Sequence, residues 1–185
     1  MGIGAVKRRA VFLDRDGVLN RAEVREGKPY PPGRVSAVQI EAEAPGCLQR
    51  LAAAGFALIV VTNQPDVARG TQTRAEVDAI NALLAAHMPI DDFFVCDHDR
   101  GACDCRKPKP GLLTAAAEKH GLELTASYMV GDRFRDVGAG QAAGCAASLW
   151  IDRGYTHDPA PEPPFVRVLT LTEAADWILR HADYN

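Results

Sequence analysis

The sequence of 185 residues predicts an α/β protein built around a doubly wound parallel sheet. Six apolar runs of strand length alternate along the chain with segments that carry helix start and stop signals. The runs are mostly continuous rather than alternating, which is typical of parallel strands covered by helices on both faces. Functional groups in such folds gather at the carboxyl ends of the strands.

The elements can be placed in order. Helices are expected at residues 45–54 before Gly55, at 73–87 behind the capping box Thr73-x-x-Glu76, and at 110–121. A last helix should begin at Thr170-x-x-Glu173. Residues 21–37 and 152–164, rich in Pro, Gly and charge, are expected to be irregular. The expected strands are residues 10–13, 57–61, 93–95, 128–130, 147–151 and 165–169.

We expect one domain over residues 1–185, without a cap domain. The stretch from Asn20 to the first helix is too short for a large lid, and the connection after Gln64 leads straight into a helix. Substrate choice would then fall to three loops: residues 21–37, the cysteine-rich loop 96–105 and the turn at 133–135.

Composition narrows the class of protein. Hydrophobic residues make up 47% of the chain and charged residues 24%, which are ordinary globular values. The net charge of −3 gives no general attraction to nucleic acid or anionic membranes. No apolar stretch reaches the ~20 residues of a membrane span, and no signal peptide precedes the first strand. We therefore expect a monomeric cytoplasmic enzyme with a small-molecule substrate, and no nucleic-acid or membrane partner.

The first apolar run ends in Asp14-Arg15-Asp16-Gly17. Side chains alternate along a strand, so Asp14 and Asp16 can share one site while Arg15 points away. Two carboxylates so close repel each other, and a divalent cation between them relieves the repulsion. The pattern favours metal-assisted phosphoryl transfer with a carboxylate nucleophile, although a strand that stops in a polar turn would read the same way.

Three more segments place polar groups after expected strands. Thr62-Asn63-Gln64 offers a hydroxyl and amides for phosphate oxygens, although such residues are also ordinary in turns. Lys107, between prolines in a basic segment, suits a transferring phosphoryl group, with a solvated turn as the alternative. Asp132 would complete an acidic metal site, and Asp136 lies one helical turn later. Acidic residues are also common in the first turn of a helix.

Cys96-x-His98-x4-Cys103-x-Cys105 supplies four ligands within ten residues, a tetrahedral set for Zn²⁺. With all four positions filled by protein, the ion would be structural and would hold the loop that carries Arg106 and Lys107. A redox-active Cys-x-Cys beside a coincidental histidine is the alternative.

The order of these motifs resembles the haloacid dehalogenase superfamily from about Arg9 to the C-terminus. The closer resemblance is to its zinc-containing heptose-bisphosphate and histidinol-phosphate phosphatases. The residues that carry it are Phe12-Leu13-Asp14-Arg15-Asp16-Gly17, Thr62-Asn63-Gln64 with Ala68-Arg69-Gly70, Cys103-Asp104-Cys105-Arg106-Lys107-Pro108 and Val130-Gly131-Asp132.

The resemblance implies a role for each motif. Asp14 would attack phosphorus to form an aspartyl-phosphate, and Asp16 would act as general acid and then general base. The Asp14 carboxylate, the Asp16 main-chain carbonyl and Asp132 would hold Mg²⁺, with Asp136 supporting the site through water or Lys107. Thr62 and Lys107 would bind the phosphoryl oxygens.

The resemblance places the substrate-recognition cations at Arg106 and Arg133, and Arg25 and Lys28 are available from the first long loop. Such a rim suits a second, non-reacting phosphate, because arginine binds two oxygens at once. The resemblance therefore favours D-glycero-D-manno-heptose 1,7-bisphosphate, with loss of the C7 phosphate.

Two departures from the family pattern concern the substrate. Pro65-Asp66 stands where relatives usually carry Ser-Gly, and the segment between His98 and Cys103 is short. Histidinol phosphate and a nucleic-acid 3′-phosphate end remain alternative substrates. A non-enzymatic, zinc-stabilised binding module is the remaining alternative of a different class.

Overall fold

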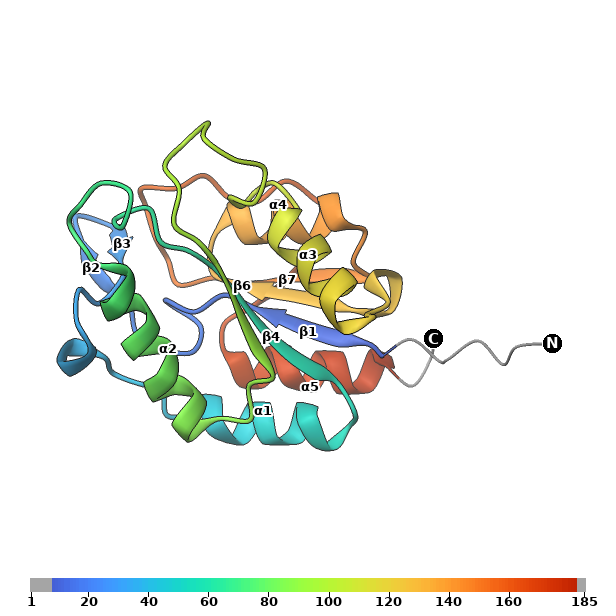
Figure 1. Cartoon of the computed structure of the whole chain (residues 1–185). Coiled ribbons are helices and arrows are strands. Elements are labelled where there is room, and N and C mark those ends of the chain that lie inside the picture. The colour runs from blue at the N-terminus through green and yellow to red at the C-terminus, as the bar shows by residue number, and fades with distance from the viewer. Residues whose placement is uncertain (1–7, 183–185) are drawn as a thin grey trace.

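The computed structural model describes residues 8–182, and its centre is a six-stranded parallel sheet (Figure 1). The strand order is β5-β4-β1-β6-β7-β8, so β1 lies between β4 and β6. This is the doubly wound arrangement expected from the sequence. The strands are β1 (Ala10–Leu13), β4 (Ala57–Asn63), β5 (Asp92–Cys96), β6 (Tyr128–Gly131), β7 (Ala147–Ile151) and β8 (Val166–Val168).

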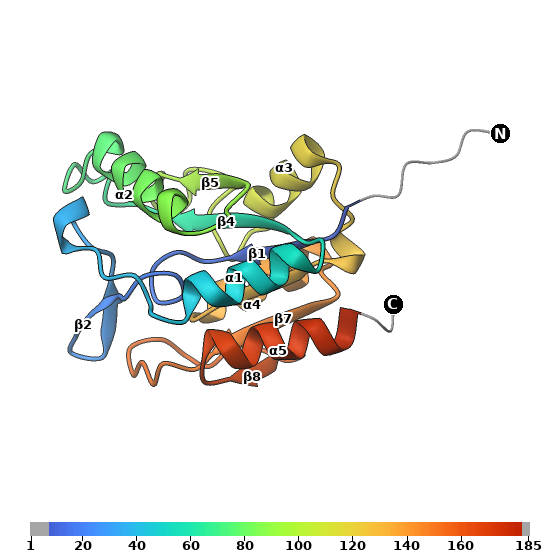
Figure 2. The same ribbon diagram turned by 90° about the horizontal axis from the view of Figure 1, so that it is seen from below.

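Helices cover both faces of the sheet. In Figure 1, α1 and α5 lie below the strands, and α3 and α4 lie above them. Figure 2, seen from below, shows α1 and α5 side by side across the sheet. The helices are α1 (Ala44–Ala53), α2 (Arg74–His87), α3 (Gly111–His120), α4 (Phe134–Ala143) and α5 (Leu171–His181).

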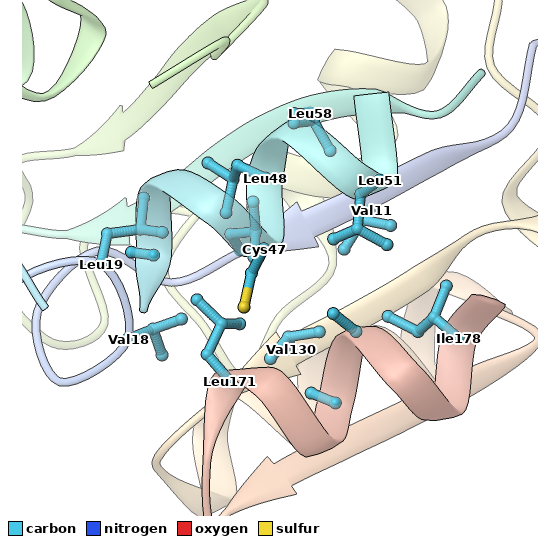
Figure 3. Close-up of a cluster of buried hydrophobic side chains, with 14 of the residues drawn as sticks. Val11, Val18, Leu19, Cys47, Leu48, Leu51, Leu58, Val130, Leu171 and Ile178 are labelled. Carbon is cyan, nitrogen blue, oxygen red and sulfur yellow. The ribbon is translucent and has the colours of Figure 1, made fainter. Parts of the chain in front are cut away.

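Burial on both faces explains why the strand sequences are continuously apolar. Val11 and Leu13 of β1 pack into a core with α1, α2 and α5, part of which Figure 3 shows. Ala10 and Phe12 of the same strand pack on the opposite face with α3 and α4. All four side chains are fully buried, so β1 is apolar along its whole length and the first polar residue, Asp14, follows its last residue, Leu13.

The prediction that residues 21–37 are irregular is wrong. Glu23–Arg25 (β2) and Lys28–Tyr30 (β3) form an antiparallel hairpin, and Val35–Ala37 forms a 3-10 turn. Glu26 and Gly27 make the connection with positive φ angles of 50° and 74°, as a tight hairpin turn requires. Pro29 argues against a strand at the sequence level, because proline is rare within sheets. It is tolerated here because a two-stranded ribbon has free edges.

Between β1 and α1, the described chain holds only this hairpin and the 3-10 turn, in place of a cap domain. None of the helices within residues 8–182 is both long and apolar enough to cross a bilayer. The single domain predicted over residues 1–185 includes positions 1–7 and 183–185, which lie outside the described residues.

Candidate active site

A cavity of about 180 Å³ lies at the carboxyl ends of β1 and β4 and the start of α4. Most of the side chains singled out in the sequence meet there, because parallel strands end at the same edge of a sheet. The predicted site residues that line the cavity are Asp14, Asp16, Thr62, Asn63, Arg106, Lys107, Arg133 and Asp136.

Lys107 forms the electrostatic centre of the site. Its ammonium lies 2.9 Å from Asp14 Oδ1 and 2.6 Å from Asp136 Oδ1, and it donates to the Val61 carbonyl oxygen at 2.7 Å. Burial alone would lower the pKa of Lys107, but the Asp136 and Asp14 carboxylates outweigh burial and raise it. The lysine is therefore charged when it contacts the two carboxylates.

Asp14 is a carboxylate in a crowded anionic site. Burial and the nearby Asp136 charge raise its pKa to about 6, against the opposing effect of Lys107. Its Oδ1 also accepts a hydrogen bond from the backbone N–H of Arg15 at 2.8 Å. The crowding indicates that Asp14 gains from a cation in addition to Lys107.

Three carboxylates form a group that can hold this cation. One oxygen from each of Asp14, Asp132 and Asp136 lies within 4.8 Å of the others. Asp132 Oδ1 is buried and has no hydrogen-bond partner among the described residues. Oxygen ligands and clustered negative charge are what Mg²⁺ requires, so the donor set fits the ion.

Asp132 lies beneath the cavity rather than in its lining, with only 2% of its surface exposed. Burial and the Asp14 and Asp136 charges raise its pKa well above the ordinary range. Its Oδ2 accepts a hydrogen bond from the Tyr155 hydroxyl at 2.8 Å, and Trp150 Nε1 donates to its main-chain carbonyl oxygen at 3.0 Å. Burial and the adjacent Asp132 raise the pKa of Tyr155, so this phenol remains a donor.

The Asp16 carboxylate is oriented by three donors. Arg15 is fully buried and donates to both Asp16 oxygens at 3.1–3.3 Å, while Asn20 Nδ2 donates at 3.0 Å. Gln64 Nε2 donates to Asp16 Oδ2 at 2.7 Å and to Thr62 Oγ1 at 2.9 Å. Arg15 points away from the cavity, as expected, but its side chain fixes the neighbouring acid instead of reaching solvent.

Two residues expected to contact substrate have other contacts. Gln64 is fully buried and is absent from the cavity lining, because its amide is engaged by Asp16 and Thr62. Arg25 is also absent from the lining: it pairs with Glu23 on the exposed hairpin, at 2.7 Å. Lys28 of the same hairpin does line the cavity, since β3 rather than β2 faces the site.

The cysteine cluster has the geometry of one metal site. The Sγ atoms of Cys96 and Cys105 lie 3.6 Å and 3.2 Å from Cys103 Sγ. His98 Nδ1 lies 3.8 Å from Cys96 Sγ and 3.4 Å from Cys105 Sγ. Thiolates bound ~2.3 Å from a tetrahedral zinc are separated by roughly 3.8 Å, so the four residues fit one ion.

The cysteine loop is tied to the acidic site through Asn63. The Asn63 side chain accepts from the Lys107 backbone N–H and donates to the Lys107 carbonyl oxygen, both at 3.1 Å. Arg106 donates to the His98 carbonyl oxygen at 3.1 Å. The expected link between the loop and these cations is therefore a direct hydrogen bond for Arg106, whereas Lys107 is held by Asn63.

The rim of the cavity is more basic than the sequence suggested. Arg133 donates through Nε to Asp158, and Arg135 lies 3.8 Å from the same carboxylate. Burial and the adjacent Arg133 lower the pKa of Arg135, which indicates surplus positive charge. Polar lining residues that the sequence analysis did not name individually as site residues include Tyr30, Asp66, Arg69, Arg100, Arg135 and His157.

These rim residues come from β3, α4 and several loops, and Arg69 is the one noted in a motif, Ala68-Arg69-Gly70. Tyr30, Arg100 and Arg135 fall in the three segments expected to choose the substrate, although they were not named. Asp66, the departure beside Pro65, lies 3.5 Å from Arg69. Arg69 also pairs with Asp99 at 2.7 Å. The extra acid is therefore partly neutralised by a neighbouring cation.

Comparison with known proteins identifies the family. The chain is 33% identical over 183 residues to the D-glycero-beta-D-manno-heptose-1,7-bisphosphate 7-phosphatase of Escherichia coli K12, covering 92% of this chain and 87% of that protein. The chain belongs to the haloacid-dehalogenase-like phosphatases. The enzyme of the same name from Rhodopseudomonas palustris is 34% identical over 161 residues, which are 78% of this chain and 84% of that protein. A family model described as HAD-hydrolase-like matches residues 104–174.

A solved structure supports the same membership in this phosphatase family. The D,D-heptose 1,7-bisphosphate phosphatase of B. bronchiseptica, complexed with magnesium and phosphate, superposes with a TM-score of 0.79 at 26% identity. The match covers 94% of this chain and 99% of that one. The corresponding enzyme of Burkholderia thailandensis, at 21% identity and a TM-score of 0.65, shares the fold.

Proposed function

We propose that this phosphatase removes the C7 phosphate of D-glycero-D-manno-heptose 1,7-bisphosphate through an aspartyl-phosphate. The observation that carries the proposal is the pairing of Asp14 with Lys107 beside an independently oriented Asp16, in a chain whose relatives bear that name. Asp14 has an oxygen available for attack, since within residues 8–182 Lys107 and the Arg15 backbone engage its Oδ1 and leave its Oδ2 without a hydrogen bond.

In the first step, an Asp14 oxygen forms a bond to phosphorus while the ester bond to the sugar oxygen breaks. Asp16 gives its proton to the departing oxygen. In the second step, Asp16 takes a proton from water, whose oxygen attacks phosphorus and releases the Asp14 carboxylate and inorganic phosphate. Arg15, Asn20 and Gln64 hold Asp16 in position for both transfers.

The residues that would hold Mg²⁺ are Asp14, Asp132 and the main-chain carbonyl of Asp16, with Asp136 acting through Lys107. When bound, the ion neutralises negative charge on the phosphoryl group. Thr62 Oγ1 and the Lys107 ammonium would bind the phosphoryl oxygens. Both side chains line the cavity, and Lys107 is held by contacts to two carboxylates and a carbonyl.

We assign Cys96, His98, Cys103 and Cys105 a structural Zn²⁺, supported by their mutual distances. All four positions are protein ligands, so the ion would fix the loop instead of activating water. The thiols must be reduced to bind it, which supports a cytoplasmic location. A single domain over residues 1–185, a monomeric state and the lack of nucleic-acid or membrane partners belong to the same proposal and rest on composition and charge.

The bisphosphate substrate is supported by the charge of the rim. One phosphate would be bound at Lys107, which leaves Arg100, Arg106, Arg133 and Arg135 around the cavity. Guanidinium groups bind phosphate through two parallel hydrogen bonds. Histidinol phosphate brings its own positive charge, which this rim would repel.

The test compares kcat/KM for heptose 1,7-bisphosphate, fructose 1,6-bisphosphate, histidinol phosphate and a 3′-phosphorylated oligonucleotide. Heptose bisphosphate should give the highest kcat/KM. Arg106→Ala should lower kcat/KM for heptose bisphosphate more than it lowers turnover of p-nitrophenyl phosphate. Arg50→Ala is the control, since Arg50 lies outside the cavity and pairs with Asp176 at 2.6 Å. A preference for another substrate, or indifference to Arg106→Ala, would reject the assignment.

Hydrolysis of p-nitrophenyl phosphate with and without Mg²⁺ tests the chemistry separately from the substrate. A protein that hydrolyses no phosphate ester under either condition would be the zinc-stabilised binding module instead.

A further inference from the structure

The irregular segment between β7 and β8 reaches back over the acidic site. Arg153 Nε donates to the Gly17 carbonyl oxygen at 3.0 Å, directly after the Asp14–Asp16 turn. Three and four residues later, the backbone N–H groups of Thr156 and His157 donate to the Gly27 carbonyl oxygen at 3.2 and 3.3 Å. Tyr155 lies between these two anchors, so its position is fixed from both sides.

Tyr155 engages only one of the two Asp132 oxygens. Its hydroxyl donates to Oδ2 at 2.8 Å, while the buried Oδ1 has no partner within residues 8–182. A buried carboxylate oxygen without a hydrogen bond is costly unless something else satisfies it. The phenol thus fixes the rotation of the carboxylate and leaves the other oxygen for an ion held with Asp14 and the main-chain carbonyl of Asp16.

The backbone at Gly17 is adapted to this contact. Gly17 has a φ of 90°, and a Cβ placed on it would lie 1.9 Å from Asp132 Oδ2 and 3.0 Å from the Tyr155 oxygen. Glycine therefore provides the space in which the phenol and the carboxylate meet. The contact is built by three segments far apart in the sequence.

We propose that Tyr155 is a positioning residue for the metal site, which orients Asp132 through Oδ2 so that Oδ1 binds Mg²⁺. The inference rests on the proposed function for the identity of the ion. Residues that orient a metal ligand typically change metal affinity by ~10–100-fold when removed. Tyr155→Phe removes the hydroxyl and keeps the ring, so the packing of the ring is retained and the change is confined to the contact with Asp132.

The experiment measures Mg²⁺ binding by isothermal titration calorimetry, in protein dialysed free of added Mg²⁺ without a chelator that would also strip zinc. Tyr155→Phe should raise the Kd for Mg²⁺ by about tenfold. The matched control is Tyr128→Phe, because Tyr128 packs against Phe56 and Trp177 in the core, away from the acidic site. The control should bind Mg²⁺ like the wild type.

A second readout separates positioning from a structural role. In Tyr155→Phe the half-saturating Mg²⁺ concentration for p-nitrophenyl phosphate hydrolysis should rise by the same factor, with kcat recovered at saturating Mg²⁺. The Tm without Mg²⁺ should fall by no more than a few degrees, since a single hydrogen bond to a buried acceptor is lost. A Kd within about twofold of wild type, or a fall in Tm without a change in Kd, would overturn the inference.

The outcomes also separate this inference from the proposed function. A wild type that binds Mg²⁺ but hydrolyses no heptose bisphosphate would reject the proposed substrate. The role of Tyr155 would then still be decided by the Kd of Tyr155→Phe for Mg²⁺. A wild type that turns over heptose bisphosphate with a Tyr155→Phe variant of unchanged Mg²⁺ affinity would reject the inference alone. A wild type that binds no Mg²⁺ would overturn the inference and the metal part of the function.

Discussion

Replacement of Lys107 by methionine tests the electrostatic balance of the site. The side chain is 2% exposed, and its ammonium contacts Asp14, Asp136 and the Val61 carbonyl oxygen at 2.9, 2.6 and 2.7 Å. Methionine fills a similar volume but leaves two buried carboxylates without their cation. Breaking a buried ion pair by removing one partner costs about 3–5 kcal/mol, so the free energy of unfolding should fall by that amount.

The loss should also depend on pH. A carboxyl whose native pKa lies above its unfolded value loses stability as pH rises through the native pKa. The pKa of Asp14 is already raised to about 6 with Lys107 present, and removal of the lysine raises it further. Lys107→Met should therefore be least destabilised at acidic pH, with the deficit growing as pH rises through 6 and above.

The assay is urea denaturation without added Mg²⁺, from acidic to alkaline pH, with Lys109→Met as the matched control. Lys109 is 51% exposed and pairs with Asp104 at 2.7 Å, so its loss should cost less than about 1 kcal/mol. The double variant Lys107→Met/Asp136→Asn should be more stable than Lys107→Met alone, because one unpaired charge is gone. A deficit below about 1 kcal/mol, or a deficit that shrinks as pH rises, would refute the reasoning.

Other predictions address catalysis, zinc and the helical layer. Asp14→Asn should abolish phosphate release, since an amide does not attack phosphorus, and near wild-type turnover by this variant contradicts the mechanism. Asp16→Asn should lower kcat by ~10²–10⁴-fold. Elemental analysis should find about one Zn²⁺ per chain. Cys103→Ser should lower both the zinc content and the Tm, whereas Cys145→Ser should change neither, and a zinc-free wild type contradicts this. Glu43→Gln should cost about 1 kcal/mol in unfolding experiments, because the Glu43 carboxylate accepts three hydrogen bonds at the start of α5. Burial opposes these bonds, but they lower the pKa of Glu43, so the deficit should be complete at neutral pH and shrink as pH falls from the ordinary range of a glutamate through the lowered pKa. A deficit independent of pH contradicts this.

The layered sheet follows from local sequence patterns. Continuous apolar runs predict strands buried on both faces, and the structure places alternate β1 side chains in two separate cores. The sequence also predicts that Asp14, Thr62 and Asp132 lie close together, because parallel strands end at one edge of a sheet. The cysteine cluster spans ten residues, and four side chains so close in sequence can converge within a single loop.

The hairpin β2–β3 and the composition of the rim could not be predicted in this way. Pro29 and the charged residues conceal a short ribbon, and its turn decides that Lys28 rather than Arg25 reaches the cavity. Gln64 follows the right strand, but the contacts of its amide with Asp16 and Thr62 decide its role.

The sequence by itself therefore determined the sheet, the position of the acidic motifs at its edge and the clustering of Cys96, His98, Cys103 and Cys105. Those features depend on periodicity and on neighbours a few residues apart. Only the tertiary structure decided which carboxylate oxygen Tyr155 engages and which arginines share Asp158. These contacts join the end of β6 and the start of α4 to the irregular segment after β7, more than twenty residues away, and the direction of a loop side chain is set by the distant groups against which it packs.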